Sequence, residues 1–250
     1  RRPPEPPPTV GDRIRTVIRG IGQTAITAGV IILLFVAYEL WFTDYLNERA
    51  QKNATDKLEQ AWHSGADPLV GSGGSAAQGQ IRQIPLGTSI AIIRIPRLGL
   101  DYARTIVEGT NAEDLAIGPG HYVGTALPGA VGNFALAGHR VGKGSPFLDV
   151  DKLKPGDAIV IETRSSWYTY RMLGANPQHI PGQEIVDPSD VNVIAPVPDH
   201  PGEQPTQAMI TLTSCHPKFS ARERMIIHGV LTGPPRPKSQ GEPPALKEAP

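Results

Sequence analysis

The sequence predicts a mainly β fold, a closed β-barrel of about eight strands with short helices, and a single transmembrane helix in front of it. Short runs of β-branched and aromatic residues alternate with turns rich in glycine and proline, which is typical of small barrels. Few stretches beyond residue 83 favour a helix. One uncharged apolar segment near the N-terminus is long enough to span a bilayer.

The composition limits the number of domains and the kinds of partner. The 250 residues leave room for one folded domain with appendages. The 24 basic and 24 acidic side chains balance, so we expect no nucleic-acid partner. The 26 prolines and 27 glycines exceed ordinary usage and favour short strands joined by many turns.

We expect residues 20–43 to form a transmembrane signal anchor. Gly20 to Tyr38 carries no charge and is about as long as a membrane-spanning helix. Trp41 and Phe42 suit the headgroup boundary, and arginines precede the segment while acidic residues follow it. A cleaved signal peptide would have a shorter apolar core that ends in small residues. The charge bias therefore predicts a cytoplasmic tail at residues 1–19 and an extracellular remainder, anchored in the cell membrane.

Three further segments follow the anchor. Residues 44–83 are predicted to be a stalk and flexible linker, because helix-forming residues give way to glycine, serine, alanine and glutamine. Residues 84–232 contain the strand-like runs and form the folded domain, which should not need the segments before about Gln80. Residues 233–250 are rich in proline, lysine and glutamate and are predicted to be a disordered tail that cannot span a bilayer.

The folded domain begins with several recognisable elements. Ser89–Pro96 is β-branched and partly alternating, which predicts a strand. Leu115–Ala126 is rich in glycine and favours a loop or a short helix. Asn133–Ala137 is a strand bounded by glycines, and Ala158–Thr163 forms a predicted antiparallel pair with Trp167–Leu173.

A connection rich in proline and aspartate, Gln183–Gln207, leads into the strand that carries the only cysteine, Cys215. Because side chains alternate along a strand, Thr211, Thr213 and Cys215 share one face. A face of hydroxyls that leads to a thiol suits a groove for an extended peptide. The next strand, within Arg222–Gly229, begins with arginine and brings a guanidinium close to the thiol. An unpaired cysteine in an exported protein indicates intermolecular pairing or a reactive thiol.

Seven histidines could serve as the acid and base that a reactive thiol needs. His139 ends the glycine-bounded strand, and His216 directly follows Cys215 and should face away from it. His228 shares a face with Arg224 but lies about 13 Å along the strand from it. The histidines in the stalk and in the proline-rich connections are expected to be solvated.

Three segments together resemble the sortase family of cysteine transpeptidases. Thr211–Cys215 is similar to the sortase signature Thr-Leu-x-Thr-Cys, with Ser214 in place of the usual threonine. Leu136–Arg140 resembles the histidine strand of the family, and the run that begins at Arg224 resembles its arginine strand. The resemblance extends from about residue 84 to residue 231 and implies a sortase-type barrel. Three other segments resemble class E, the housekeeping sortases of high-GC Gram-positive bacteria: Ile95–Leu100, Gly118–Tyr122 and His216–Arg222.

The resemblance implies the residues of an active site. It makes Cys215 the nucleophile, His139 the acid and base, and Arg224 the group that stabilises the oxyanion. Arg222 is the other arginine nearby and is expected to be a solvated loop charge. The residues implied to bind the substrate peptide are Ala137, Thr211 and Thr213, with Tyr122 as a candidate selectivity residue.

The resemblance also implies an activity. Sortases cut a C-terminal sorting signal between Thr and Gly through a cysteine thioester, and they join the Thr to an amine. Class E enzymes prefer Leu-Ala-x-Thr-Gly, with Leu-Pro-x-Thr-Gly as the other signal, and attach surface proteins to a cell-wall precursor amine. Two alternatives stay open: a pilin-polymerising sortase, and a non-catalytic membrane-tethered barrel that binds a wall component.

We expect no metal and no cofactor. Some sortases bind calcium, but no set of carboxylates in this sequence resembles a calcium site. The acidic side chains of the domain are scattered and suit a solvated face better than a metal site. These residues are Glu108, Asp114, Asp149 and Asp151.

Overall fold

The computed structural model describes three stretches of the chain, residues 10–38, 43–69 and 84–248. The chain divides into two compact units, one up to Thr43 and one from Asp44 onward. The predictions for the other residues lie outside this description. They concern the proline-rich start of the tail, Trp41 and Phe42, most of the flexible linker and the last two residues.

The first unit contains α1 (Val10–Ala37), a helix of 28 residues. Its segment Ile14–Val36 has a mean hydropathy of 1.8 and is long and apolar enough to cross a membrane. The described side chains of this segment are exposed, as those of a membrane-spanning helix are when lipid is absent. The helix starts before Gly20, where the predicted anchor begins, because the flanking segment contains no proline and continues it.

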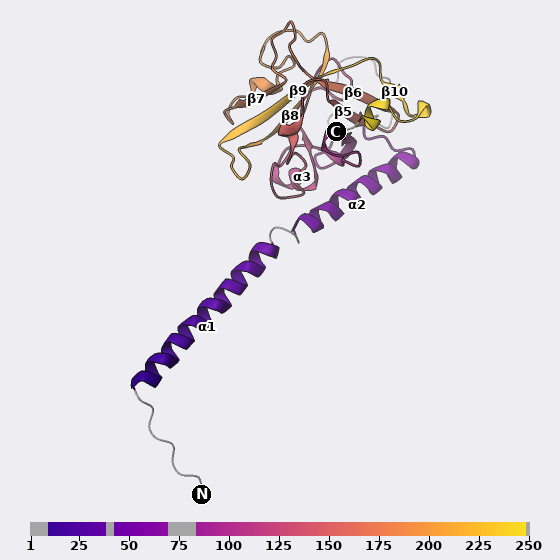
Figure 1. Cartoon of the computed structure of the whole chain (residues 1–250). Coiled ribbons are helices and arrows are strands. Elements are labelled where there is room, and N and C mark those ends of the chain that lie inside the picture. Colours follow the sequence, from indigo (N-terminus) through magenta and orange to yellow (C-terminus); the bar gives the residue numbers. More distant parts are fainter. Residues whose placement is uncertain (1–9, 39–42, 70–83, 249–250) are drawn as a thin grey trace. The chain divides into compact units, whose positions relative to one another are not determined.

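Eight strands in the described part of the second unit form a closed ring (Figure 1). In ring order they are β6 (Ser166–Met172), β5 (Ala158–Glu162), β1 (Ser89–Arg94), β2 (Ala103–Glu108), β3 (Gly120–His121), β4 (Gly132–Ala137), β8 (Ala208–His216) and β9 (Glu223–Leu231). Antiparallel pairing of β6 with β9 closes the ring. The pairs β2–β3 and β4–β8 are parallel. The prediction of a closed barrel of about eight strands is confirmed.

Two further strands and several short helices complete the second unit. β7 (Gln183–Val186) pairs with β9, and β10 (Arg236–Pro237) pairs with β6. The segment predicted as a loop or short helix contains the end of α3 (Ala112–Ile117) and then β3. The sequence analysis did not identify β2, β3 or β7, and the latter two are too short to show a period. The 3-10 helices among the described residues are η2 (Pro96–Leu98), η3 (Val150–Lys152), η4 (Asn192–Ile194), η5 (Lys238–Gln240) and η6 (Pro244–Lys247).

Alternate side chains of the ring strands fill the interior of the barrel. Leu212 of β8 and Ile227 of β9 are register partners, and both lie in the main buried cluster. Phe134 and Leu136 of β4 and Ile210 of β8 belong to the same cluster. The side chains between them therefore face the outside of the ring. This alternation puts the hydroxyl and thiol face of β8 on the outer surface of the barrel.

The predicted stalk forms α2 (Thr43–His63), and this helix packs on the barrel. Leu58 is 4% exposed, and Gln51 Oε1 accepts a hydrogen bond from the backbone N–H of Thr105 at 2.9 Å. The hydroxyl oxygens of Thr55 and Thr105 are 2.7 Å apart. Gln51, Thr55 and Leu58 recur at the spacing of one helical face, and this face of α2 turns to the barrel. The helix is therefore part of the folded unit and not only a spacer.

Residues 233–248, predicted to be a disordered tail, lie against β5 and β6. Ala245 is 4% exposed and packs with Trp167. The ammonium of Lys238 lies 4.1 Å from the centroid of the Trp167 ring and pairs with the carboxylate of Glu162. The segment has no periodic pattern of its own, and its order comes from contacts with residues as many as 77 positions away.

Replacing Leu58 should measure what α2 contributes to stability. Leu58→Ala should lower the free energy of unfolding by about 2 kcal/mol or more, because it leaves a cavity between α2 and the barrel. Lys57→Ala, at an exposed position of the same helix, should change it by less than about 0.5 kcal/mol. Urea denaturation followed by tryptophan fluorescence measures both variants. Equal losses in the two would contradict packing of α2 on the barrel.

Candidate active site

Cys215 lies near the C-terminal end of β8, on the outer face of the barrel, and is half-buried. In the antiparallel ladder between β8 and β9 it is the direct partner of Arg224. Directly paired residues of neighbouring strands have Cβ atoms about 5 Å apart. The structure therefore places the thiol and the guanidinium at one site.

His139 lies two residues beyond the end of β4 and alongside the cysteine strand, because β4 pairs in parallel with β8. Just beyond β4, the N–H of Gly138 donates to the Thr213 carbonyl at 3.0 Å. Ser214 Oγ donates to the Gly138 carbonyl at 2.8 Å. These bonds continue the pairing of the two strands, so His139 lies beside the end of β8 that carries Cys215.

The surroundings of His139 favour its neutral form. Its side chain is half-buried, and Nε2 is buried with no hydrogen-bond partner among the described residues. Burial, and then the positive charge of Lys143, lower the pKa of His139. A neutral imidazole beside a thiol can accept its proton and later give a proton to a leaving group.

Arg140, the residue after His139, anchors the backbone at the cysteine. Its side chain is 2% exposed and pairs with Asp151 at 2.9 Å. Nε of Arg140 donates to the Leu148 carbonyl at 2.8 Å, and Nη1 donates to the Cys215 carbonyl at 3.4 Å. A buried guanidinium needs these partners, and together they hold the end of β8 in place. The sequence analysis missed this role, because Leu148 and Asp151 come from a segment without a recognisable motif.

Arg224 is half-buried on β9, whereas Arg222 is exposed just before this strand. Nη1 of Arg224 donates to the carbonyls of Ala221 and Glu223, at 3.0 Å and 3.0 Å. A guanidinium has five N–H donors, so donors remain for a substrate oxygen at the thiol. The arrangement favours Arg224 over Arg222 as the arginine that contacts a substrate.

Tyr122 and Thr213 meet on the outer face of the barrel, where their hydroxyl oxygens are 3.1 Å apart. The segment that carries Tyr122 is held by the buried side chain of His121, whose Nδ1 lies 2.7 Å from Glu108 Oε2. Ala137, the last residue of β4, is the partner of Thr213 in the parallel ladder. Three of the four predicted groove residues therefore lie near one another.

Thr211, the fourth predicted groove residue, is fully buried. Its Oγ1 donates to Asn133 Oδ1 at 2.8 Å and lies 2.9 Å from His228 Nδ1. The hydroxyl is occupied by these internal bonds. Thr211 therefore lies on the same face of β8 as Cys215 but is covered, and it is not open to solvent as Tyr122 partly is.

Two of the acidic residues expected on a solvated face are buried. Glu108 is 4% exposed because the imidazole of His121 satisfies its carboxylate, and Asp114 is 5% exposed at the start of α3. Asp149 and Asp151 are more accessible and pair with basic side chains. Each carboxylate therefore has separate surroundings, and the four do not form one metal site in the described part of the chain.

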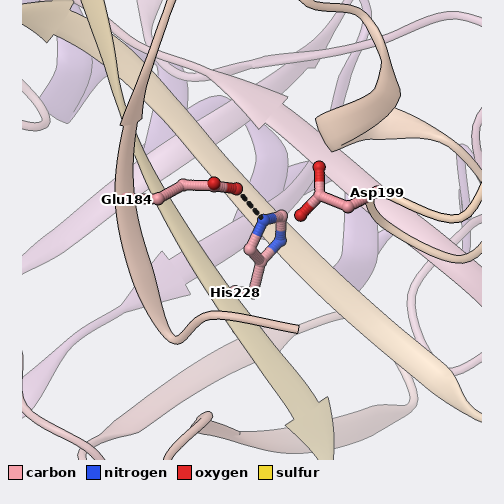
Figure 2. Close-up of side chains that lie close together, drawn as sticks. All are labelled: Glu184, Asp199 and His228. Carbon is pink, nitrogen blue, oxygen red and sulfur yellow. Dashed lines mark hydrogen bonds and ion pairs between the residues drawn. The ribbon is translucent and has the colours of Figure 1, made fainter. Parts of the chain in front are cut away.

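A polar cluster that the sequence analysis did not find surrounds His228 (Figure 2). Glu184 of β7 and Asp199 of the following connection converge on the imidazole, and one ligand atom of each lies within 4.8 Å of the others. Burial, and then the Glu184 carboxylate, raise the pKa of Asp199. No motif signals this cluster, because its members meet only through the pairing of β7 with β9 and the fold of the connection.

Known proteins are similar to this chain in sequence and in fold. The sortase domain family matches residues 93–232. Sortase E1 of Streptomyces coelicolor is 37% identical over 235 residues, which cover 91% of this chain. The chain spans 60% of the length of sortase E1. Sortase E2 of the same species is 31% identical over 217 residues, which cover 84% of this chain and 80% of that protein.

Two solved structures are also similar. The SrtF sortase from Corynebacterium diphtheriae is 39% identical with a TM-score of 0.62, covering 69% of this chain and 100% of that one. Sortase E from Streptomyces avermitilis is 38% identical with a TM-score of 0.56, and the match covers 65% of this chain and 99% of that one. With a barrel that presents a cysteine beside an arginine, these matches indicate a cysteine transpeptidase. The chain belongs to the sortase family, and the matches to sortases E1, E2 and E support class E within it.

Removing the charge of Lys143 should raise the pKa of His139. Lys143→Ala takes away a positive charge that disfavours the imidazolium, so the pKa should move up toward its ordinary value, although burial still lowers it. Lys154→Ala, at another exposed lysine, should leave the titration unchanged. NMR titration of the His139 ring protons measures both variants. A pKa that stays the same or falls in Lys143→Ala would contradict this account.

Proposed function

We propose that this protein is a membrane-anchored sortase that cuts a C-terminal sorting signal between Thr and Gly and attaches surface proteins to a cell-wall precursor amine. The observation that carries the proposal is the position of Cys215 directly opposite Arg224, with His139 after the neighbouring strand. Leu-Ala-x-Thr-Gly is the preferred signal on this proposal, because the chain resembles class E. A structure of sortase E1 from Streptomyces coelicolor with a tripeptide in the active site, 39% identical to this chain, supports a peptide substrate.

The reaction on this proposal is an acyl transfer carried by three side chains. His139 first takes the proton of the Cys215 thiol. The thiolate then attacks the carbonyl carbon of the signal threonine, and the Arg224 guanidinium binds the oxyanion that forms. His139 donates a proton to the glycine amine as the C–N bond breaks, which leaves a thioester on the cysteine. The acceptor amine then attacks the thioester, His139 takes a proton from it, and the thiolate leaves.

The helix α1 holds the enzyme in the cell membrane on this proposal, with the barrel outside the cell. Arg15 and Arg19 lie in the N-terminal part of this helix, and the positive-inside rule keeps such a flank in the cytoplasm. Exported surface proteins and cell-wall precursors are then on the same side of the membrane as Cys215. The partners of the enzyme are therefore the sorting signal and the precursor amine.

Tyr122 is the proposed selectivity residue of the groove. Its hydroxyl contacts Thr213, which shares a face of β8 with Cys215. A peptide that lies extended along this face toward the thiol passes the phenol ring before it reaches the cysteine. We assign Tyr122, Thr213 and Ala137 to the binding of the signal residues before the threonine, with Thr211 as a buried support on the same face of β8.

Removing the nucleophile or the acid should stop the reaction without unfolding the barrel. Cys215→Ala should abolish cleavage of a fluorogenic Leu-Ala-x-Thr-Gly peptide, and His139→Ala should lower the rate at least about a hundredfold. His216→Ala is the matched control, because this residue is adjacent to the cysteine and its side chain is on the opposite face of β8. Circular dichroism checks the fold of each variant. Turnover near the wild-type rate in Cys215→Ala would exclude the sortase reaction.

A lysine substitution at Arg224 separates the effect of the positive charge from the effect of the planar guanidinium. Lysine keeps the positive charge but loses the planar set of donors, so Arg224→Lys should lower kcat about a hundredfold or more, roughly 3 kcal/mol of transition-state stabilisation. KM should change much less, because the contact strengthens as the oxyanion forms. Steady-state kinetics with Arg222→Lys as the control, expected to be nearly silent, tests this. The reverse pattern would assign the oxyanion to Arg222.

A further inference from the structure

Three ligand-type side chains from separate segments converge (Figure 2), and they lie next to Thr211 on the outer side of β8 and β9. His228 of β9 is fully buried, and its imidazole lies between the carboxylates of Glu184 and Asp199. The Glu184 side chain is 23% exposed, so the cluster has a path to solvent. No residue of this cluster has a role in the proposed acyl transfer.

Hydrogen-bond accounting identifies the protonated nitrogen of the imidazole. The Asn133 amide nitrogen donates to the carbonyls of Val193 and Ala195, at 3.3 and 3.0 Å, which turns Oδ1 toward Thr211. Thr211 has one hydroxyl proton, and it donates this proton to Asn133 Oδ1 at 2.8 Å. The hydroxyl oxygen must therefore accept from His228 Nδ1, 2.9 Å away. His228 carries a proton on Nδ1.

The other nitrogen of the same ring then faces two acceptors. With Nδ1 protonated, Nε2 of neutral His228 presents a lone pair, and Glu184 Oε1 lies 3.2 Å from it. Asp199 Oδ2 is buried and has no hydrogen-bond partner among the described residues. A single proton does not satisfy all three groups. On Nε2 it leaves this oxygen of Asp199 without a partner, and shared between Asp199 and Glu184 it leaves the lone pair of Nε2 facing acceptors. A cation between the three atoms would satisfy all of them.

We infer that Glu184, Asp199 and His228 form a binding site for a divalent first-row transition metal ion such as Zn²⁺. One imidazole nitrogen and two carboxylates are typical ligands of such ions, whereas Ca²⁺ and Mg²⁺ favour oxygen ligands alone. Thr211 and Asn133 supply the second shell, because they fix the tautomer and the orientation of the imidazole. Water can complete the coordination from the exposed side of Glu184.

The metal site would link β7 and the connection before β8 to the strands that carry the proposed groove. Its ligands come from β7, from the connection before β8, and from β9. Thr211, the second-shell residue, is on the same face of β8 as Cys215 and about 13 Å away along the strand. A bound ion would hold the connection against β8 and β9 and would not touch the reacting atoms, so this inference does not depend on the proposed function.

Zinc titration of the full chain in detergent tests the site, in the Cys215→Ala background so that the thiol cannot bind the metal. Competition with a chromophoric chelator should show one bound Zn²⁺ per chain, and excess Ca²⁺ should not displace it. Adding Glu184→Gln or Asp199→Asn should weaken zinc binding at least about tenfold. Glu113→Gln, at an exposed carboxylate on α3, is the matched control and should leave the affinity unchanged.

Thermal unfolding gives a second readout and shows whether each variant folds. Zinc should raise the Tm of the Cys215→Ala protein and of the Glu113→Gln control, and raise it less in the Glu184→Gln and Asp199→Asn variants. Two results would overturn the inference. One is the absence of zinc binding at millimolar zinc. The other is equal affinity in the parent and in folded Glu184→Gln and Asp199→Asn variants, which would leave a protonated Nε2 and an ion pair as the state of the cluster.

Discussion

The strand β8 pairs with β4 on one side and with β9 on the other, and the register of these two pairings decides whether the protein has an active site. Because side chains alternate along the strand, a shift of one residue would turn Cys215 toward the apolar interior and Leu212 toward solvent. Burial of Ile210 and Leu212 makes that shift costly, since each fully buried aliphatic side chain contributes about 2 kcal/mol. The apolar packing that stabilises the barrel therefore also holds the thiol opposite Arg224.

The arginines near the thiol have different tasks. Arg140 is buried and neutralised by Asp151, so its charge holds the backbone of β8, whereas Arg224 keeps donors for a substrate. Burial and the positive charge of Lys143 lower the pKa of His139, which favours its neutral form. This division leaves Arg224 as the charge available to a substrate oxygen and His139 as the group that can exchange a proton.

Segments outside the ring extend the folded unit beyond the predicted domain of residues 84–232. The ammonium of Lys238 lies over the rings of Trp62 in α2 and Trp167 in β6, 5.4 and 4.1 Å from their centroids. A cation can be shared in this way only when all three segments are folded together. The stalk and the tail are thus ordered by the barrel and by each other, without strong patterns of their own.

The sequence alone predicted the apolar helix and the alternation of a β-barrel. It also predicted that Cys215, His139 and Arg224 belong to strands that can be neighbours. These features are local, because a period or a motif is complete within about ten residues. The docking of α2, the order of residues 233–248 and the cluster at His228 depend on pairs such as Gln51 with Thr105, 54 positions apart, and Glu184 with His228, 44 apart. Contacts of this kind cannot be inferred from either segment alone, because the distances between the segments depend on how the ring closes.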